Sequence, residues 1–485
     1  MAIAIDRELA GDINNPSFDV INYCIEEHEK EIPRLEMLFD YYLGNPHKKG
    51  SQPTDTPHDR EEYFVNNAKY VTDLMVGFMV GAPISYTAAK GKDITPVIEA
   101  LDVMKIKKHD KELEKGLSAM GIGTELHYLA IKPGTTDETI PKVAWIDPRG
   151  MILVVDDTVD KNKLFAIRPV EKRNLKRETY WEIQIYTAKG IIKYQSKTKK
   201  LKESDLIKKP IFKEHFYREV PVVEFRNNEE KQGDYEQQLS QIDKYNILQN
   251  DRIKDKQNFV KAIMFLFGFN LPDEDEKPND INGTLAVEAP SKEEGGDVEY
   301  ATNTFTESEV QKLADSMLED FHKSTYVPNL NDEQFAGNIS GEAMKYKLFG
   351  LLLVLSIKIG YFEDGLVERL RLIQNILNVK GKHVDTEGVT IKFKPNLPIN
   401  RTEIINQIKD SQEFIPLLIS LGWLDDIDDP QEIVEMLEEQ KEKNITLQAK
   451  AMGVQAKDSH SDLDDPSEEE EYNEPRPPKK TNGNE

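Results

Sequence analysis

The chain has 485 residues, enough for two or three packed units. Its 63 Lys and Arg against 88 Asp and Glu give a formal net charge of −25, which argues against a protein that grips nucleic acid statically by neutralising phosphates. Hydrophobic residues (38%) can build a core, but 31% charged residues imply much solvated surface. Helix formers dominate the second half and strand formers cluster at 143–226, which predicts the α+β class.

Cysteine content and apolar segments bear on the compartment. Cys24 is the single cysteine, so an intrachain disulfide is impossible and a reducing compartment is expected. Residues 1–11 lack a basic segment followed by an apolar one, so no secretory signal is expected. The most apolar run, 348–357, is half the length of about 20 residues that a bilayer requires. We therefore expect a soluble, intracellular protein without membrane contact.

The N-terminal half combines helices with short strands. Apolar residues at helical spacing predict helices at 17–43, with a kink or split at Pro33, and at 62–80, 95–105 and 108–130, the last interrupted by Gly121 and Gly123. From 143 the apolar period shortens, and turn residues separate strand-like runs at 143–146, 151–155, 164–167, 180–186, 191–194 and 220–225. This order predicts an antiparallel meander.

Two polar helices are expected at 235–260 and 306–322. The first has a thin apolar seam formed by Leu239, Ile242, Tyr245 and Ile253. Such a helix cannot bury itself within one subunit, which predicts packing beside neighbouring chains. Between the two helices lies an insertion of short strands and acidic loops.

A polar loop and a long helix follow the second polar helix. Ser340 is a suitable N-cap for a helix at 341–379, whose middle is apolar nearly all round and is expected to be buried. The remaining elements are a strand at 389–393, helices at 401–420 and 430–449, and an acidic tail beyond 458 that is expected to be disordered.

Catalytic motifs are not found. The sequence has no phosphate-binding loop and no Cys/His zinc pattern, and Gly121-x-Gly123 lacks the third glycine of a dinucleotide site. Asp156, Asp157 and Asp160 could hold a divalent metal, but Asp between strands is ordinary turn chemistry. We therefore expect no catalytic residues, no metal and no cofactor, and a protein that is not an enzyme.

The segment joining the second polar helix to the long helix carries the most specific pattern. From Pro328 to Leu348 it reads P-x-x-x-D-x-x-F-x-G-N-x-S-G-x-A-x-x-x-x-L. This stretch resembles the junction of tunnel loop and long helix in the portal proteins of tailed phages, in the family common in long-tailed phages of Gram-positive bacteria. The resemblance covers roughly 20–450 and is concentrated at 326–350.

That resemblance implies a portal fold with a wing of helices and an antiparallel meander, a two-helix stem and a clip. The implied ranges are a wing at 1–232, a stem helix at 233–260, a small α/β clip insertion at 261–304, a second stem helix at 305–328, a tunnel loop at 329–341, a long wing helix with its return strand at 342–400, a helical crown at 401–457 and a disordered acidic tail at 458–485.

The resemblance also implies a function and partners. Members of the family form a closed homo-oligomeric ring, here expected to hold about twelve copies, through which double-stranded DNA passes during packaging, retention and ejection. The ring would occupy one capsid vertex of the virion after assembly in the host cytoplasm. Its implied partners are the terminase large subunit, the scaffolding and major capsid proteins, and the head–tail connector. A mainly acidic channel would offer sliding DNA few counterion-releasing contacts, so contacts with DNA would be non-specific and transient.

Site residues follow from the same resemblance. The DNA-facing side chains of the tunnel loop would be Asn329, Asn331, Asp332, Gln334, Asn338 and Ser340. Gly337 and Gly341 would let that loop flex. In the clip, Phe265, Phe267 and Phe269 alternate along a strand and would contact other clip subunits or, alternatively, a motor or adaptor. A plain surface loop at 329–341 is the competing interpretation.

Two other function classes fit parts of the sequence. A non-enzymatic acidic scaffolding or adaptor protein of a phage head would share the acidity and the absence of catalytic motifs. A DNA-processing enzyme would need an unrecognised carboxylate site, for which Asp156 and Asp157 are candidates. An annulus in electron micrographs separates a portal from an adaptor, and magnesium-dependent nuclease activity would favour the enzyme.

Overall fold

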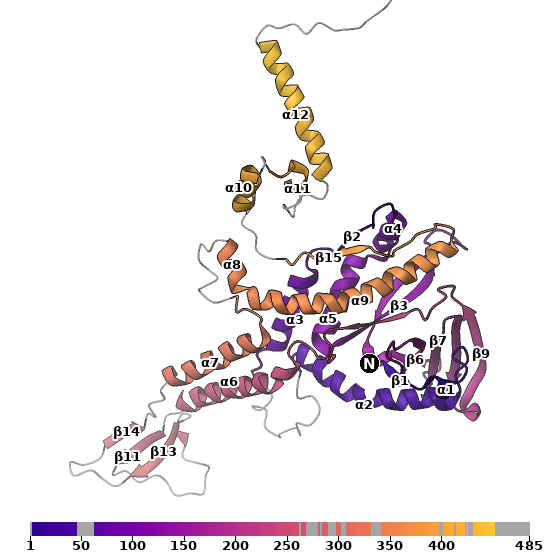
Figure 1. The fold of residues 1–485 in the computed structure, drawn as a ribbon. Coiled ribbons are helices and arrows are strands. Elements are labelled where there is room, and N and C mark those ends of the chain that lie inside the picture. Colours follow the sequence, from indigo (N-terminus) through magenta and orange to yellow (C-terminus); the bar gives the residue numbers. More distant parts are fainter. Residues whose placement is uncertain are drawn as a thin grey trace, which may run out of the picture. The chain divides into compact units, whose positions relative to one another are not determined.

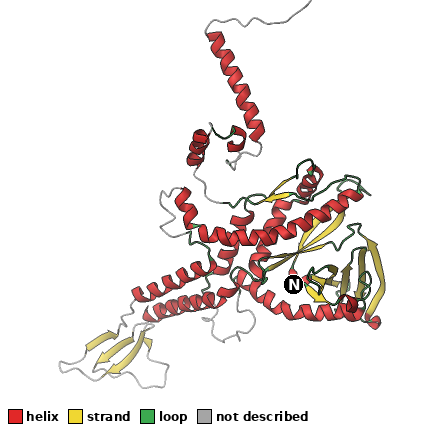
Figure 2. Ribbon diagram, viewed as in Figure 1, coloured by secondary structure: helices red, strands yellow, loops and turns green. Residues whose placement is uncertain are grey.

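The fold comes from a computed structural model. It describes residues 2–45, 63–260, 263–267, 280–281, 284–289, 297–301, 307–330, 341–396, 401–411, 414–421, 424 and 430–451. Two compact units are formed, unit 1 at 1–398 and unit 2 at 399–485. Both helices and strands build unit 1 (Figure 2), so the α+β class is confirmed.

Unit 1 is built from long helices and several sheets (Figure 1). Its helices are α1 (Arg7–Ala10), α2 (Phe18–Tyr42), α3 (Asn67–Val80), α4 (Thr95–Met104), α5 (Ile106–Met120), α6 (Leu239–Val260), α7 (Glu307–Thr325), α8 (Gly341–Lys347) and α9 (Phe349–Val379). Its strands are β1 (Ile3–Ile5), β2 (Ser85–Thr87), β3 (Ile122–Ile131), β4 (Thr139–Ile146), β5 (Ile152–Asp156), β6 (Lys163–Arg173), β7 (Thr179–Tyr186), β8 (Gly190–Ser196), β9 (Leu206–Glu214), β10 (Val222–Arg226), β11 (Ile263–Phe267), β12 (Asp280–Ile281), β13 (Thr284–Ala289), β14 (Asp297–Ala301) and β15 (Thr390–Lys392).

The largest sheet has the strand order β1-β5-β6-β7-β8-β9. Strands β5 to β9 pair antiparallel in sequence order, and β1 adds in parallel beside β5. The predicted meander is therefore confirmed for the runs at 151–194, but the runs at 143–146 and 220–225 belong to β4 and β10 of a separate sheet. The meander includes β9, which the sequence analysis did not predict. Pro210 is tolerated inside β9 because this strand lies at the sheet edge, where one side needs no partner.

Helix α2 joins two hydrophobic cores. Its first half buries Ile21 and Ile25 against the six-stranded sheet, and its second half buries Leu35 and Leu38 in the main core. Of the kink or split predicted at Pro33, the split is not observed, because α2 is continuous from Phe18 to Tyr42. Packing of both halves offsets the hydrogen bond that proline removes.

The main core gathers α2 to α5 and α9 around the sheet β10-β3-β4. The predicted helix at 108–130 is wrong beyond Met120. Gly121 has φ of 80° and ends α5, because a left-handed residue cannot continue a right-handed helix. The chain then forms β3, which pairs with both β4 and β10.

The long helix also differs from the prediction. The helix expected at 341–379 is divided at Leu348 into α8 and α9. Its middle is not buried all round, because Leu351 and Leu355 are 1% exposed while Leu353 and Ile357 are 53% and 59% exposed. Neither unit contains, among its described residues, a helix with the length and hydropathy of a membrane span.

The insertion between α6 and α7, which is the predicted clip, and unit 2 are smaller than the rest of the molecule. Strands of the insertion form a mixed sheet in the order β12-β13-β11-β14. Unit 2 contains α10 (Arg401–Ser411), α11 (Leu417–Leu421) and α12 (Pro430–Ala451). Helices predicted at 401–420 and 430–449 are therefore confirmed, with the first divided into α10 and α11. The acidic tail from 458 lies outside the described residues.

Candidate functional site

The two polar helices α6 and α7 lie side by side (Figure 1). The Arg252 Nη2 donates to Gln311 Oε1 at 2.7 Å, and Ser324 Oγ donates to Gln241 Oε1 at 3.2 Å. These contacts join polar side chains, whereas Ile242 of α6 and Phe321 of α7 are buried in the main core. The pair is therefore held by apolar packing at one end and by polar contacts along its length.

The base of α6 is anchored to the body of unit 1. Tyr41 donates to both carboxylate oxygens of Asp243 at 2.8 Å, and Asn246 Oδ1 accepts from the backbone N–H of Val65 at 2.7 Å. Arg34 forms a two-pronged ion pair with Glu236, just before α6. Charge-assisted and bidentate bonds of this kind fix direction as well as distance, so they orient the stem.

The predicted apolar seam of α6 is only partly covered. Ile242 is buried, but Ile253 is 38% exposed and Ile247, outside the predicted seam, is 59% exposed. On α7, Leu313 is 52% exposed. These side chains are left uncovered by their own subunit, as the sequence analysis expected for a helix that packs beside neighbouring chains.

The start of the predicted tunnel loop is fixed by an aromatic pair. Tyr70 donates from its hydroxyl to the Pro328 carbonyl at 2.9 Å and accepts from the Leu330 backbone N–H at 3.1 Å. Its ring meets that of His322 edge-on, with centroids 5.7 Å apart. Asn329 therefore lies between two anchored residues.

The rest of the predicted loop lies outside the described residues. This applies to Asn331, Asp332, Gln334, Gly337, Asn338 and Ser340. Gly341 is the first residue of α8, so the loop spans the interval between the Tyr70 anchor and that helix.

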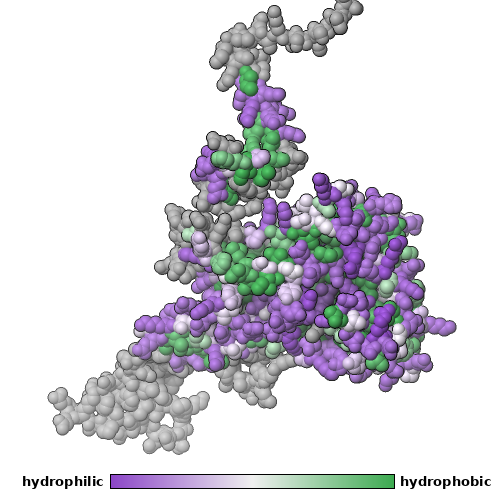
Figure 3. All heavy atoms as spheres, viewed as in Figure 1, coloured by the Kyte–Doolittle hydropathy of each residue, from purple (hydrophilic) through white to green (hydrophobic). Residues whose placement is uncertain are grey.

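An apolar stripe follows the exposed side of α8 and the start of α9. Tyr346, Phe349, Leu353 and Ile357 are each more than half exposed. The spacing of four residues places Phe349, Leu353 and Ile357 on one side of α9, and Tyr346 lies on α8 just before them. Figure 3 shows hydrophobic atoms gathered over this part of α9. We call these four residues the apolar stripe.

The opposite side of α9 carries two buried cations, Lys358 and Arg369. Arg369 is fully buried, and its guanidinium contacts Asp110 at 2.7 Å and Glu125 at 2.6 Å. His109 Nε2 lies 2.8 Å from the same Glu125 carboxylate. Burial would raise the pKa of Glu125, but Arg369 and His109 hold it well below its ordinary range. This site therefore stays ionised and ties α9 to α5 and β3.

Lys358 forms the second site, three turns nearer the N-terminus of α9. Its Nζ donates to Glu114 Oε1 at 2.6 Å and to Asp234 Oδ2 at 2.7 Å. Burial raises the pKa of Glu114 to about 7, because one ammonium cannot fully compensate two nearby carboxylates. Lys358 thus ties α9 to α5 and to the segment that leads into α6. The sequence analysis missed both sites, although a single Lys inside an apolar helix was a visible signal.

The candidate metal site is a turn. Asp156 accepts from Thr158 Oγ1 at 2.6 Å and from the Asn162 backbone N–H at 2.9 Å, which closes the connection between β5 and β6. Asp157 and Asp160 are exposed. Within the described ranges, no group of three His, Cys, Asp or Glu side chains could hold a metal.

Two of the three phenylalanines of the predicted clip lie in a central strand. Phe265 and Phe267 belong to β11, which pairs with β13 on one side and β14 on the other. Phe269 lies outside the described residues. Strand β11 is therefore an inner strand of this sheet.

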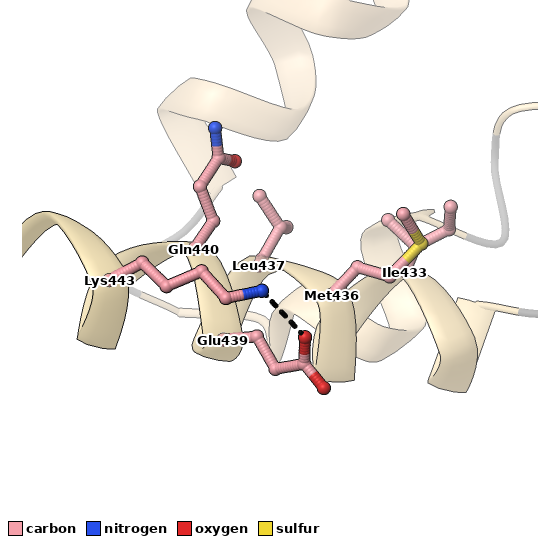
Figure 4. A pocket seen from close by; sticks show the side chains of 6 residues that line it. All are labelled: Ile433, Met436, Leu437, Glu439, Gln440 and Lys443. Carbon is pink, nitrogen blue, oxygen red and sulfur yellow. Dashed lines mark hydrogen bonds and ion pairs between the residues drawn. The ribbon is translucent and has the colours of Figure 1, made fainter.

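A shallow hollow in unit 2 is lined from one side (Figure 4). Its lining comes from the single helix α12, namely Ile433, Met436, Leu437, Glu439, Gln440 and Lys443. Glu439 and Lys443 form an exposed ion pair at 3.3 Å. This arrangement has the character of one amphipathic helix face and offers no set of groups for catalysis.

Comparisons with known proteins agree with the pattern at 326–350. The family model described as "Phage portal protein, SPP1 Gp6-like" matches residues 21–446. The portal protein of Bacillus phage SPP1 is 20% identical over 497 aligned positions, which cover 95% of this chain and 93% of that protein. The portal protein of Clostridium phage phiCD119 is 24% identical over 278 positions, covering 56% of this chain and 59% of that relative.

Proposed function

Because the chain belongs to the SPP1 Gp6-like family of phage portal proteins, we propose that it forms a closed ring enclosing a DNA channel at one capsid vertex. In this role the ring admits double-stranded DNA during packaging, retains it and releases it at ejection. It acts as a structural component and not as an enzyme. The copy number expected for such a ring is about twelve.

The apolar stripe is the observation that carries this proposal. Four large apolar side chains are more than half exposed: Tyr346 on α8, and Phe349, Leu353 and Ile357 on one side of α9. A contiguous apolar surface of this kind usually marks an interface. Ile247 of α6 and Leu313 of α7 are also more than half exposed, and a heterologous contact repeated around a ring would cover both sets.

The channel wall follows from the polarity of the stem. The exposed surface of α6 includes Asp251, Lys254 and Asp255, with charges of both signs. Mixed charges release few counterions on contact with a phosphate backbone, so DNA would slide without a preferred register. We assign the tunnel loop at 329–341, with its short polar side chains, to transient contact with that DNA.

Other partners follow from the same role. The ring would contact scaffolding and major capsid proteins in the head, the terminase large subunit during packaging, and the head–tail connector afterwards. We assign Phe265, Phe267 and Phe269 of the clip to contacts between subunits or with these partners. Assembly in the host cytoplasm and residence in the virion complete the proposal.

Shortening the loop tests the channel role. Removing residues 331–339 should leave rings intact in electron micrographs, because the Tyr70 anchor and α8 remain, but should impair packaging or retention of DNA in a head-filling assay. A matched control removes residues 134–137 from the exposed turn between β3 and β4 and should package normally. Full heads at the normal yield from the loop-shortened variant would contradict the assignment.

A further inference from the structure

One face of the six-stranded sheet gathers cations from three strands, β6, β8 and β9. Gln184 of β7 lies opposite both Arg168 of β6 and Lys193 of β8. Side chains of directly paired residues project from the same face of a sheet. The same rule adds three further cations to this face. Together they are Arg168, Lys172, Lys193, Lys208 and Lys213, which we call the basic sheet face.

A single carboxylate lies among these cations. Glu182 is 6% exposed and is engaged by Lys172 Nζ at 2.8 Å and by Gln184 Nε2 at 2.6 Å. Burial would raise the pKa of Glu182, but the bonds from Lys172 and Gln184 lower it, so this group stays ionised and occupied. The other four cations form no ion pair with a carboxylate of the described residues. The basic sheet face therefore keeps a positive surplus.

The surrounding sequence strengthens that surplus. Residues 161–214 contain 16 Lys and Arg against six Asp and Glu, a net charge of +10 in a chain whose total is −25. A local field of opposite sign to the whole molecule attracts a polyanion to this surface and repels it from most others. The ordered sheet fixes the positions of these charges.

The composition of the face favours nucleic acid over protein. Protein interfaces are depleted in Lys at their centre and depend on aromatic and apolar anchors. Here lysine dominates. The apolar side chains on the same face are Val170, Ile211 and the partly buried Ile191, with Tyr180 and the buried Tyr186 at its two ends. Compact ammonium groups spread over a rigid surface match phosphates without reading bases. The face suits the backbone of duplex DNA.

The position of the face separates it from the channel. Strand β9 lies at the end of unit 1 away from the stem helices α6 and α7 (Figure 1). DNA held there cannot be the DNA that passes along the stem. We infer that the basic sheet face is a second DNA-contact surface, which binds the backbone of duplex DNA lying outside the channel. This inference rests on the proposed function for the presence of DNA around the ring and for the place of the channel along α6 and α7.

A closed circular DNA tests this inference, since it cannot thread a closed ring. Purified full-length protein is titrated with relaxed closed-circular plasmid by filter binding at several salt concentrations. A variant with Arg168, Lys193, Lys208 and Lys213 each changed to Gln should bind at least about tenfold more weakly at moderate salt. Its slope of log affinity against log salt should fall by about 3.6, for four phosphates at about 0.9 each. Lys172 is kept so that Glu182 stays paired.

A matched control carries the same charge change elsewhere. Four exposed lysines supply this control, namely Lys107, Lys108 and Lys111 on α5, and Lys90. Changing each of them to Gln should leave plasmid affinity within about twofold of that of the unchanged protein, with a similar slope of log affinity against log salt. Equal losses in both variants would overturn the inference, because attraction would then be general. If the protein binds poly-L-glutamate but not the plasmid, the inference is overturned, and the partner of this face is an acidic protein instead of DNA. Electron micrographs of each variant report ring formation separately, so failure of the proposed function is distinguishable.

Discussion

The two halves of α9 are held in opposite ways. From Lys358 to Ile376, one side of the helix is buried in its own subunit and carries two buried cations. From Phe349 to Ile357, buried Leu351 and Leu355 alternate with exposed side chains of the apolar stripe. The half from Lys358 to Ile376 is packed within its own chain. The half from Phe349 to Ile357 leaves apolar side chains for a neighbouring chain to cover.

This difference separates what one chain specifies alone from what a ring supplies. A buried cation with two carboxylates has only one satisfied geometry, so Arg369 and Lys358 fix the axis and rotation of α9 before assembly. An apolar stripe, by contrast, gains its stability only on association. Helix α9 is thus oriented by its own subunit from Lys358 onward, and its beginning is covered by the next subunit.

The largest expected difference comes from adding one charge to the buried side or to the exposed side of the same turn of α9. Leu355 is 1% exposed and Leu353 is 53% exposed. Leu355→Asp buries an unpaired charge and should destabilise the subunit by about 5 kcal/mol, giving insoluble or unfolded protein. Leu353→Asp should change the stability of the subunit by less than about 0.5 kcal/mol but prevent ring formation. Thermal unfolding and size-exclusion chromatography measure both; rings from Leu353→Asp would contradict the role of the stripe.

Removing the buried guanidinium should have the next largest effect. Arg369→Met leaves Asp110 and Glu125 buried without their cation, which should cost about 3–5 kcal/mol of unfolding free energy. Urea unfolding in the Leu353→Asp background avoids a contribution from assembly. Adding Asp110→Asn and Glu125→Gln should recover part of the loss, because the buried charges are then gone. No recovery would mean that packing of Arg369, rather than its charge, holds α9.

The Lys358 site predicts a pH dependence. Burial raises the pKa of Glu114 from about 4.5 to about 7, so the folded state binds a proton more tightly than the unfolded state. The stability from this group is complete below about pH 4.5 and is lost as pH rises through about 7. Between pH 5 and pH 8, unfolding free energy should fall by about 2.5 kcal/mol, and Glu114→Gln should remove that fall. Equal pH profiles for the two proteins would show that Glu114 is ionised throughout.

The smallest expected effect concerns the close approach of α9 to β10. A Cβ added at Gly365 would lie 2.4 Å from the Phe225 ring, so Gly365→Ala should destabilise by about 1–2 kcal/mol. Gly360 meets nothing within 4 Å and serves as the control. Gly360→Ala should stabilise by up to about 1 kcal/mol through helix propensity. Both are measured by thermal unfolding in the Leu353→Asp background; equal shifts would refute the tight packing of this half.

Periodicity predicted most of the secondary structure. The meander and the helices α4, α6 and α7 follow from apolar spacing and turn residues, which are local signals. Local signals failed where tertiary pairing decides. The segment 122–131 is a strand because β4 and β10 flank it, and β9 is a strand although it contains Pro210 and several lysines.

The candidate site was less accessible to sequence reasoning. The exposed side of α9 could not be told from its buried side, because both are apolar at 348–357. The acidic total also hid the basic segment 161–214, since net charge averages over the chain. Arg369 could not be matched with Asp110 and Glu125, because these partners are more than 240 residues away in sequence.

Native mass spectrometry of the purified full-length chain tests the ring most directly. Exposed apolar side chains on α8, α9 and the stem should drive one closed assembly of about twelve copies. Leu353→Asp should yield the monomer under the same conditions. A wild-type chain that stays monomeric at every concentration and salt, with no annulus in electron micrographs, would contradict the account.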